Sequence, residues 1–332
     1  MKAAVITDYK KDNINLDIRE VERPSVGPRD VLIKVTAAGV NPVDNMISRG
    51  EVKLIAPYSL PQVAGNEVVG IVESIGSQVA AFAPGDRVFG RLPLDRIGAF
   101  AEYVAVDSDA LAIVPDYLSD IEAAAVPLTA LTVMQAFDLM KIKPGASIFI
   151  SGGTGGVGTM AIPLAKAKGL KVITNGSAEH EQRVRDLGAD EFIDYKTQDY
   201  TQILHDVDYV LDTLGGDETE KQMRIMRKGG QLVSLRGMPN GEFAQRMGFP
   251  LLKRILFSLA GRKFDTMAKK HGVKYHFIFV HSDGAQLGQV AEILNDIKVT
   301  PSIDTVFEFS EVNRALEKID TGRSKGKTVI TF

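Results

Sequence analysis

Three glycines near the middle of the chain, Gly153, Gly155 and Gly158, have the spacing G-x-G-x-x-G, which could hold a phosphate-bearing cofactor. They follow a β-branched and aromatic run at 148–150 and precede an apolar segment with helical periodicity. Glycines let the backbone turn tightly and approach a pyrophosphate, and the free N–H groups at a helix start attract its charge. A second strand at 171–174 completes the strand–turn–helix–strand context that the motif requires. The segment therefore predicts a dinucleotide site, and the alternative is a glycine turn with a structural role only.

The residues after that second strand indicate which dinucleotide is favoured. An acidic residue there would hydrogen-bond the ribose 2′-OH of NAD, but residues 175–177 are Asn-Gly-Ser, without an acid. Small polar groups, with His180 and Arg183 just beyond, would tolerate a 2′-phosphate, so NADP(H) is favoured. His180 and Arg183 could instead lie on the solvated face of a helix, and for Arg183 we favour that alternative. Tyr195 follows a third strand, where its ring could lie beside the adenosine or be an ordinary half-buried tyrosine.

The bulk composition limits the class of protein. With 332 residues the chain is long enough for two domains, and 45% hydrophobic and 24% charged residues are typical of a soluble globular protein. The net charge is only −3, so there is no basic excess for general binding to nucleic acid. The chain has no cysteine, which excludes disulfides, thiolate zinc sites and cysteine nucleophiles. The first residues resemble a strand rather than a signal peptide, and no apolar stretch approaches about 20 residues, so we expect a cytoplasmic protein without a membrane span.

Two different sequence patterns along the chain predict two domains of different structural class. The first third carries short β-type runs separated by turns that contain proline and glycine, which indicates a compact, mostly antiparallel β domain. From Ile121 helical and strand patterns alternate, which predicts parallel strands joined by right-handed crossovers. The parallel sheet is complete by residue 280, so we expect the remaining chain to return to the first domain. The expected strands are 31–35, 67–72, 87–89, 103–106, 148–150, 171–174, 192–194, 209–212, 231–235, 276–280, 306–309 and 328–332, and the expected helices are 128–140, 287–294 and those that begin after the glycine turn and at 179, 218 and 311.

Several short motifs accompany the glycine turn in a fixed order. They are the segments 38–44, 64–72, 84–88, 98–103, 128–132 and 324–329. Together they resemble the medium-chain dehydrogenase/reductase superfamily and, within it, the zinc-free quinone oxidoreductase-like branch that includes zeta-crystallin, along the whole chain. The resemblance implies an α/β protein with a GroES-like β domain for the substrate (1–121 and 282–332) and a Rossmann domain with a doubly wound parallel sheet for NADP(H) (122–281). It also implies an active-site cleft between the domains and a possible homodimer formed through the edge of the Rossmann sheet.

The positions of the zinc ligands in metal-dependent relatives can be compared residue by residue. The resemblance places Asn41 where those relatives have cysteine, Asn66 where they have histidine, and the third ligand near Leu128. Amides bind zinc poorly, since a zinc site requires imidazole or thiolate. The four-cysteine structural lobe is missing, and the five histidines lie elsewhere, at 180, 205, 271, 276 and 281. We therefore expect no metal site.

The resemblance also implies roles for individual residues at the cleft. Asn41 and Asp44 match the N-x-x-D motif and are the expected catalytic residues. Asn41 would donate a hydrogen bond to a substrate oxygen or to the nicotinamide ribose, and Asp44 would orient the loop. Both could instead only cap a turn, because Asn and Asp are common turn residues. Tyr58 and Asn66 are expected on the substrate side, and no residue stands out as a general acid, so we expect water to supply the proton.

The expected cofactor contacts come from both domains. Thr132 stands where relatives contact the nicotinamide or its phosphates, or it only packs a helix. Lys327 approaches the cofactor phosphates or faces solvent, and residues 277–280 correspond to the edge where relatives hold the nicotinamide carboxamide through backbone groups. The full expected set is Thr132, Gly153, Thr154, Gly155, Gly156, Val157, Ser177, His180, Tyr195, Phe279 and Lys327.

The expected lack of a metal restricts the chemistry. Without a Lewis acid the hydroxyl proton of an alcohol is difficult to remove, whereas hydride transfer from NADPH to an electron-poor acceptor needs less assistance. The branch that the chain resembles reduces quinones, alkenals or enones with NADPH. We therefore expect an NADPH-dependent, zinc-independent oxidoreductase that transfers hydride to a quinone or an α,β-unsaturated carbonyl. The alternatives are a non-catalytic NADPH-binding sensor or structural protein on the same scaffold, or a zinc-independent alcohol dehydrogenase.

Residues 249–274 form an irregular segment whose role the sequence leaves open. The segment has seven basic residues, one acidic residue (Asp265) and a group of leucine, isoleucine and phenylalanine residues among them. A basic amphipathic helix can lie on an anionic membrane. We favour instead a mobile flap over the substrate cleft, or a surface helix whose apolar side packs on the protein.

Overall fold

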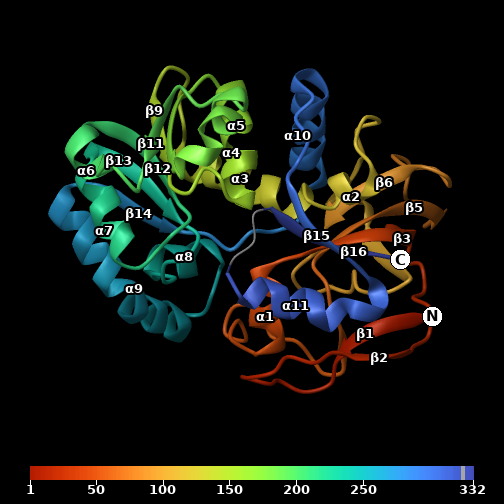
Figure 1. Cartoon of the computed structure of the whole chain (residues 1–332). Helices are drawn as coiled ribbons and strands as arrows, with labels where there is room; N and C mark the ends of the chain where they lie inside the picture. The colour runs from red at the N-terminus through yellow and green to blue at the C-terminus, as the bar shows by residue number, and fades with distance from the viewer. Residues whose placement is uncertain (323–325) are drawn as a thin grey trace. The chain divides into compact units, whose positions relative to one another are not determined.

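The chain forms two compact units in the computed structural model, which describes residues 1–322 and 326–332 (Figure 1). Unit 1 comprises Met1–Leu131 and His281–Phe332, and unit 2 comprises Thr132–Val280. Of the motif at 324–329, Ser324 and Lys325 lie outside the described residues.

Unit 1 is built around a largely antiparallel sheet. In order across the sheet its strands are β15 (Ile303–Glu308), β16 (Lys327–Thr331), β3 (Asp30–Val40), β5 (Glu67–Ile75), β6 (Arg87–Arg91) and β8 (Leu111–Ile113), with β7 (Tyr103–Asp107) paired to β3, and a smaller sheet has β2 (Asp17–Glu20), β1 (Lys2–Ile6) and β4 (Gln62–Val63). β3 pairs antiparallel with β5, β7 and β16, whereas β15 and β16 are parallel. Because β16 pairs with β3, the last strand of the chain completes a sheet formed by the N-terminal segment, as predicted.

Four helices belong to unit 1, and a fifth crosses its border. They are α1 (Pro42–Ser48), α2 (Asp120–Ala123), α10 (Gly284–Ile297) and α11 (Val312–Asp320), with α3 (Pro127–Met140) at the border. The division between the units falls inside α3, later than the expected boundary at 121–122. α2 packs against β3, β5 and β15, which explains why it belongs to unit 1.

One helical region is long and apolar enough to cross a membrane. The window Asp120–Met140 has a mean hydropathy of 1.4, and 83% of it is buried inside the protein. A helix in the core of a globular protein is also hydrophobic on all sides, because it is buried there. Length and composition are therefore weak support for a membrane span.

Unit 2 contains the predicted doubly wound sheet. Its six parallel strands follow the order β11 (Glu191–Asp194), β10 (Lys171–Gly176), β9 (Ser147–Ile150), β12 (Val207–Asp212), β13 (Met226–Ser234) and β14 (Lys274–Phe277). The connecting helices are α4 (Gly156–Ala167), α5 (Glu181–Asp186), α6 (Tyr200–Ile203), α7 (Asp217–Arg224), α8 (Gly241–Arg246) and α9 (Leu251–His271). Counted within the unit, the strand order is 3-2-1-4-5-6, the Rossmann order, which confirms the predicted fold class. The order reverses between β9 and β12, where such sheets bind their ligands.

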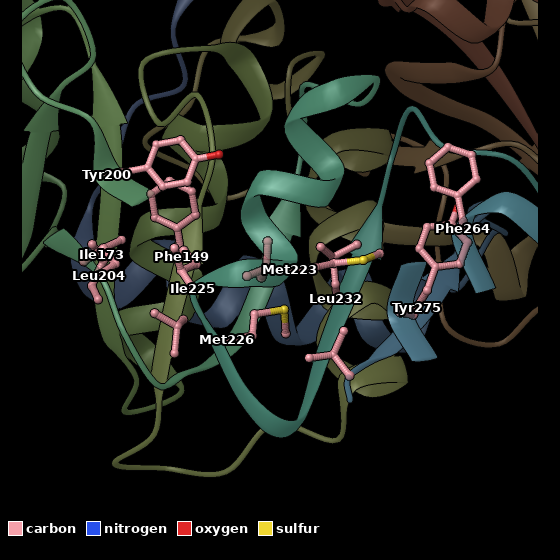
Figure 2. Close-up of a cluster of buried hydrophobic side chains, with 14 of the residues drawn as sticks. Phe149, Ile173, Tyr200, Leu204, Met223, Ile225, Met226, Leu232, Phe264 and Tyr275 are labelled. Atoms are coloured by element: carbon pink, nitrogen blue, oxygen red, sulfur yellow. The ribbon is translucent and has the colours of Figure 1, made fainter. Parts of the chain in front are cut away.

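The core of unit 2 fixes both the central strands and the long helix α9. Figure 2 shows Phe149 of β9 beside Tyr200, and their rings stack with centroids 4.9 Å apart. Phe264 of α9 stacks on Tyr275 of β14 at 5.0 Å, so α9 is anchored on the edge of the sheet (Figure 2). Ile148, Phe149 and Ile150 of β9 are apolar and fully buried, as expected for a central parallel strand covered on both faces.

The predicted strand at 276–280 is the clearest error in the sequence-based elements. β14 begins earlier and ends at Phe277, because its partner β13 ends at Ser234, which is opposite Phe277 in the register. Residues 278–281, including His281, are therefore outside the strand. The expected helix at 179 begins with a single 3-10 turn at Ala178–His180, and α5 follows it.

Candidate functional site

The glycine turn connects β9 to α4 at the switch point of the unit 2 sheet. Gly152 has a φ of +67°, which side chains rarely adopt, and Gly155 is the residue before the first turn of α4. A Cβ atom added to Gly153 would lie 2.0 Å from the Thr174 Oγ1, and one added to Gly158 would lie 2.4 Å from the Cα of Gly153. The turn and the helix therefore pack on each other too closely for any side chain at these positions.

The end of β10 holds this turn in place through hydrogen bonds to Asn175. The backbone N–H of Gly152 donates to the Asn175 Oδ1 at 2.8 Å, and that of Gly153 donates to the Asn175 carbonyl oxygen at 3.0 Å. Asn175 thus holds the loop in place. This role accounts for an amide residue near the end of β10, the region in which NAD-binding proteins have an acidic residue. Gly156 is exposed and Thr154 and Val157 are partly exposed, and the first N–H groups of a helix have no intrahelical partner. The turn therefore offers unpaired backbone donors at its surface, as phosphate binding requires.

The other predicted cofactor residues of unit 2 follow neighbouring strands. Because β9, β10 and β11 are parallel, their carboxyl ends lie at one edge of the sheet. Ser177 is buried directly after β10, His180 lies 3.4 Å from the Glu179 Oε1, and Tyr195 follows β11. Tyr195 is 58% exposed, so part of its ring is accessible beyond the end of β11. Arg183 is exposed, in agreement with the favoured alternative.

Thr132 and Phe279 lie at the two ends of unit 2 in the sequence. Thr132 is buried in α3, and Phe279 is partly exposed beyond the end of β14. Residues 278–280 follow the end of β14 at the carboxyl edge of the sheet, and their backbone groups are outside the strand ladder.

Unit 1 contains a second polar site, centred on Glu67 at the start of β5. Glu67 is fully buried, and its carboxylate accepts hydrogen bonds from the Asn41 Nδ2 and from the Leu128 backbone N–H, each at 2.8 Å. It also forms an ion pair with Lys327 of β16, whose Nζ donates to the Asn41 Oδ1 at 2.6 Å. Gly39 makes room for the carboxylate, since a Cβ there would lie 2.0 Å from the Glu67 Oε1. The Asn41 amide is therefore bonded at both ends.

The burial of Lys327 contradicts one of the two predictions made for it from the sequence. It is 8% exposed and bonded to Glu67 and Asn41, so the alternative in which it faces solvent is wrong. A buried ammonium group requires a paired carboxylate, and Glu67 supplies it.

Asp44 fixes the loop before α1. Its Oδ2 accepts from the Asn41 backbone N–H and its Oδ1 accepts from the Asn66 Nδ2, both at 2.7 Å. Burial raises the pKa of Asp44 to about 6, although the bonds from Asn66 and Asn41 lower it. Asn41, Asp44 and Asn66, three of the four residues that the resemblance assigned to the cleft, are thus joined in one network.

Three buried polar atoms beside this network have no hydrogen-bond partner among the described residues. They are the Asn66 Oδ1, the Tyr58 hydroxyl and the Arg91 Nε. Arg91 is fully buried in β6 opposite Glu67, and burial lowers its pKa to about 10. Burial also raises the pKa of Tyr58 to about 12. Buried groups of this kind are usually paired, so their lack of partners indicates a place for a polar ligand atom or water.

Glu67 and Arg91 were not among the site residues predicted from the sequence. Glu67 carried a signal, because it follows Asn66 at the expected zinc position and begins an otherwise apolar strand. Arg91 ends the run Val88–Gly90, and a charged residue at the end of a buried strand was the only sign of its place.

A pH dependence of stability is expected from Asp44. Its folded pKa, about 6, is above the ordinary 3.8, so the folded state binds this proton more tightly than the unfolded state. The stabilisation is complete below about pH 4 and is lost as the pH rises through about 6, a change of about 3 kcal/mol. In urea unfolding, the free energy of unfolding of the wild type, taken relative to that of Asp44→Asn, should fall by about 3 kcal/mol between about pH 3 and about pH 7. An equal difference between the two proteins at both pH values would contradict the assignment.

No group of three or more His, Cys, Asp or Glu side chains in the described part of the chain is placed to hold a metal ion. At the positions of the zinc ligands in metal-dependent relatives, the Asn41 and Asn66 amides donate to the carboxylates of Glu67 and Asp44. The donor set does not suit zinc, which prefers imidazole and thiolate.

Comparison with known proteins covers both units. Residues 27–116 match the family model of the alcohol dehydrogenase GroES-like domain, and residues 187–330 match that of the zinc-binding dehydrogenase. The mitochondrial NAD(P)H oxidoreductase RTN4IP1 of Danio rerio is 32% identical over 100% of this chain and 91% of its own length. The 2-methylene-furan-3-one reductase of Solanum lycopersicum is 33% identical over 99% of this chain and 79% of its own length. The solved structure of the quinone oxidoreductase from Coxiella burnetii has a TM-score of 0.81 and 28% identity, covering 100% of this chain and 99% of that one.

Proposed function

Because the chain belongs to the medium-chain dehydrogenase/reductase superfamily, in its quinone oxidoreductase-like branch, we propose that it is an NADPH-dependent, zinc-independent oxidoreductase. The proposed acceptor is a quinone or an α,β-unsaturated carbonyl. One observation favours this acceptor class over an alcohol: Asn41 and Asn66 are bonded to carboxylates where zinc-dependent enzymes need thiolate and imidazole. The tomato relative is named as a reductase of a 2-methylene-furan-3-one, which is itself an enone.

The glycine turn of unit 2 fits a nicotinamide dinucleotide, because its glycines allow the turn, β10 and α4 to pack closely and leave the first N–H groups of α4 for the pyrophosphate. Thr154, Ser177 and His180 are the proposed neighbours of the 2′-phosphate, and Tyr195 that of the adenosine. NADPH, when bound, supplies the hydride. Thr132 and Phe279 remain predicted contacts. For Lys327, the bonds to Asn41 and Glu67 favour a role in holding Asn41 in place.

Arg91 and Tyr58 are the proposed donors to the acceptor oxygen, and Asn66, whose unpaired Oδ1 accepts, is the proposed contact for a donor group of the substrate. Addition of hydride to the β-carbon of an enone leaves an enolate, and its negative charge lies on the former carbonyl oxygen. The Arg91 Nε–H and the Tyr58 hydroxyl are unpaired donors suited to that oxygen, and a buried cation stabilises it more than an exposed one. Protonation of the α-carbon by water then completes the two-electron reduction.

The Tyr58→Phe variant separates this role from a structural one. The Tyr58 hydroxyl has no partner, so its removal should leave the free energy of unfolding unchanged or slightly higher. The kcat for an enone should fall by about tenfold, the effect of one lost transition-state hydrogen bond. Stopped-flow kinetics and urea unfolding of the same preparation measure both quantities. Loss of stability with an unchanged kcat would assign Tyr58 to packing instead.

The preference for NADPH is tested by the Ser177→Asp variant. Ser177 directly follows β10, where an acid would repel a 2′-phosphate and accept a bond from a 2′-OH. We expect the Kd of NADPH to rise by at least about tenfold, while that of NADH stays the same or falls. Fluorescence titration with both cofactors measures the ratio. A wild type that binds NADH as tightly as NADPH would refute the proposed preference.

We propose that the two expected domains bind the substrate and the cofactor separately. The proposed substrate domain is 1–121 with 282–332, and the proposed NADP(H) domain is 122–281. β14 is an edge strand of the unit 2 sheet, which supports a homodimer formed by edge pairing. Cytoplasmic location also remains a prediction, and the zebrafish relative is named as mitochondrial.

Oxidation of NADPH with phenanthrenequinone, alkenals and enones tests the proposed activity. The wild type should oxidise NADPH with at least one acceptor class, and a variant unable to bind NADPH should not. Tight binding of NADPH without turnover on any acceptor would favour the non-catalytic alternative. Oxidation of alcohols by NADP⁺ that a chelator leaves unchanged would favour an alcohol dehydrogenase.

A further inference from the structure

The helix α9 has one face that anchors it on unit 2. Phe257, Gly261, Phe264 and Ala268 are buried and are spaced four, three and four residues apart, which places them in one stripe along the helix. Phe264 stacks on Tyr275 of β14, as Figure 2 shows. These residues, and not the leucines at the start of the helix, are the apolar side that packs on the protein.

The opposite face of α9 exposes large apolar side chains. At 100° per residue, the positions opposite the buried stripe in the first half of the helix carry Leu and Ile only. Their exposed fractions are between 46% and 80%, and we call them the outer apolar face: Leu251, Leu252, Ile255, Leu256 and Leu259. A contiguous patch of this kind on a protein surface marks a binding surface for a partner or a membrane.

Basic residues continue the same face toward the end of α9. Arg262, Lys263 and Lys269 are exposed there and make no ion pair with any residue that the structure describes. Lys270 lies beside them and pairs with Glu220. The outer face has no acidic residue to oppose these charges.

The acidic residue and the basic residues at the edges of α9 are already bonded. Asp265 accepts from the Asn240 Nδ2 at 2.7 Å. Arg254 donates to the Phe249 carbonyl oxygen at 2.7 Å, and the Lys253 Nζ lies 4.9 Å from the Phe249 ring centre. The cationic character of the outer face is therefore carried by Arg262, Lys263 and Lys269.

We propose that the outer face of α9 docks the protein on an anionic lipid surface. The outer apolar face would enter the boundary between headgroups and acyl chains, as it does in interfacial amphipathic helices. The long side chains of Arg262 and Lys263 would reach the lipid phosphates at the headgroup level. Charge complementarity favours lipid over a second copy, because a two-fold contact of this face with itself would set its cations against the same cations, whereas lipid phosphates are anionic. None of the residues of this face belongs to the glycine turn or to the Glu67 network, so its test does not depend on enzyme activity.

Co-sedimentation with vesicles tests the proposal on the full-length protein. The wild type should bind vesicles that contain about 30% phosphatidylglycerol in phosphatidylcholine, and bind pure phosphatidylcholine at least about tenfold less. Raising the salt from about 0.1 M to about 0.5 M should weaken the binding. No sedimentation with anionic vesicles at low salt would overturn the proposal.

Variants assign the binding to this face. Leu252→Gln/Leu256→Gln/Leu259→Gln should reduce vesicle binding at least about tenfold with little change in Tm, because these side chains are 46% to 80% exposed in the folded chain. Arg262→Gln/Lys263→Gln should remove the preference for anionic lipid. The matched control is Ile203→Gln, in which an isoleucine of α6 that is 46% exposed is changed and binding stays at the wild-type level. Equal losses in the control would overturn the proposal, as would a wild-type dimer that the triple variant dissociates without any lipid binding, since the face would then join two copies.

Discussion

Replacing Glu67 by alanine is expected to lower the free energy of unfolding by about 3–5 kcal/mol, the cost of breaking a fully buried ion pair. The variant leaves the Lys327 ammonium, the Asn41 Nδ2 and the Leu128 N–H without their shared acceptor. The buried cation carries the larger part of this penalty, because it has lost its countercharge in a region without solvent. Urea unfolding at neutral pH measures the effect.

A double variant separates the effect of the broken ion pair on stability from the effect of the lost side-chain volume. In Glu67→Leu/Lys327→Met both charges are replaced by apolar groups, and replacing a whole buried pair is often close to neutral. The double variant should therefore be more stable than Glu67→Ala by at least about 2 kcal/mol. If Glu67→Ala lost less than about 1 kcal/mol, the site would be more hydrated than the burial of Glu67 indicates.

The Gly153→Val variant should lose affinity for NADPH by about a hundredfold or more. Its Cβ would lie 2.0 Å from the Thr174 Oγ1, and Thr174 cannot move freely because it is buried and donates to the Ile150 carbonyl oxygen at 2.6 Å. The loop must therefore shift from the end of β10, and its N–H groups lose their alignment on the phosphates. Overpacking of this kind also costs about 1–3 kcal/mol of stability. Isothermal titration calorimetry with NADPH measures the affinity.

Gly288→Ala is the matched control for this change. Gly288 lies in α10, and a Cβ there would contact nothing within 4 Å. Alanine is a better helix former than glycine by about 1 kcal/mol, so the control should bind NADPH normally and be slightly more stable. Normal NADPH affinity in Gly153→Val would show that the cofactor does not bind at this turn.

Local sequence was sufficient to predict the elements that depend on neighbouring residues. The glycine turn at 153–158 was recognisable because strand, turn and helix follow one another directly, and the structure has them at the predicted place. The end of β14 was not predictable, since it is set by where β13 ends rather than by the residues 278–280 themselves.

The polar network of unit 1 depends on residues far apart in the chain. Lys327 and Asn41 are 286 positions apart, and only the pairing of β16 with β3 brings them together. The resemblance to the family indicated Asn41 and Asp44. It gave no sign that Glu67 would accept a hydrogen bond from the Asn41 amide and form an ion pair with Lys327. In α9, similarly, the sequence showed leucines and basic residues, but only packing on β14 decides which stripe is buried.

The most direct test of the proposed function follows the hydride itself. NADPH deuterated at the transferable position of the nicotinamide should be oxidised with methyl vinyl ketone, and the product should be examined by NMR. The account predicts a saturated ketone with deuterium on the former β-carbon and a solvent hydrogen on the α-carbon. Deuterium on the carbonyl carbon of an allylic alcohol, or no reaction with any enone or quinone while NADPH binds tightly, would contradict it.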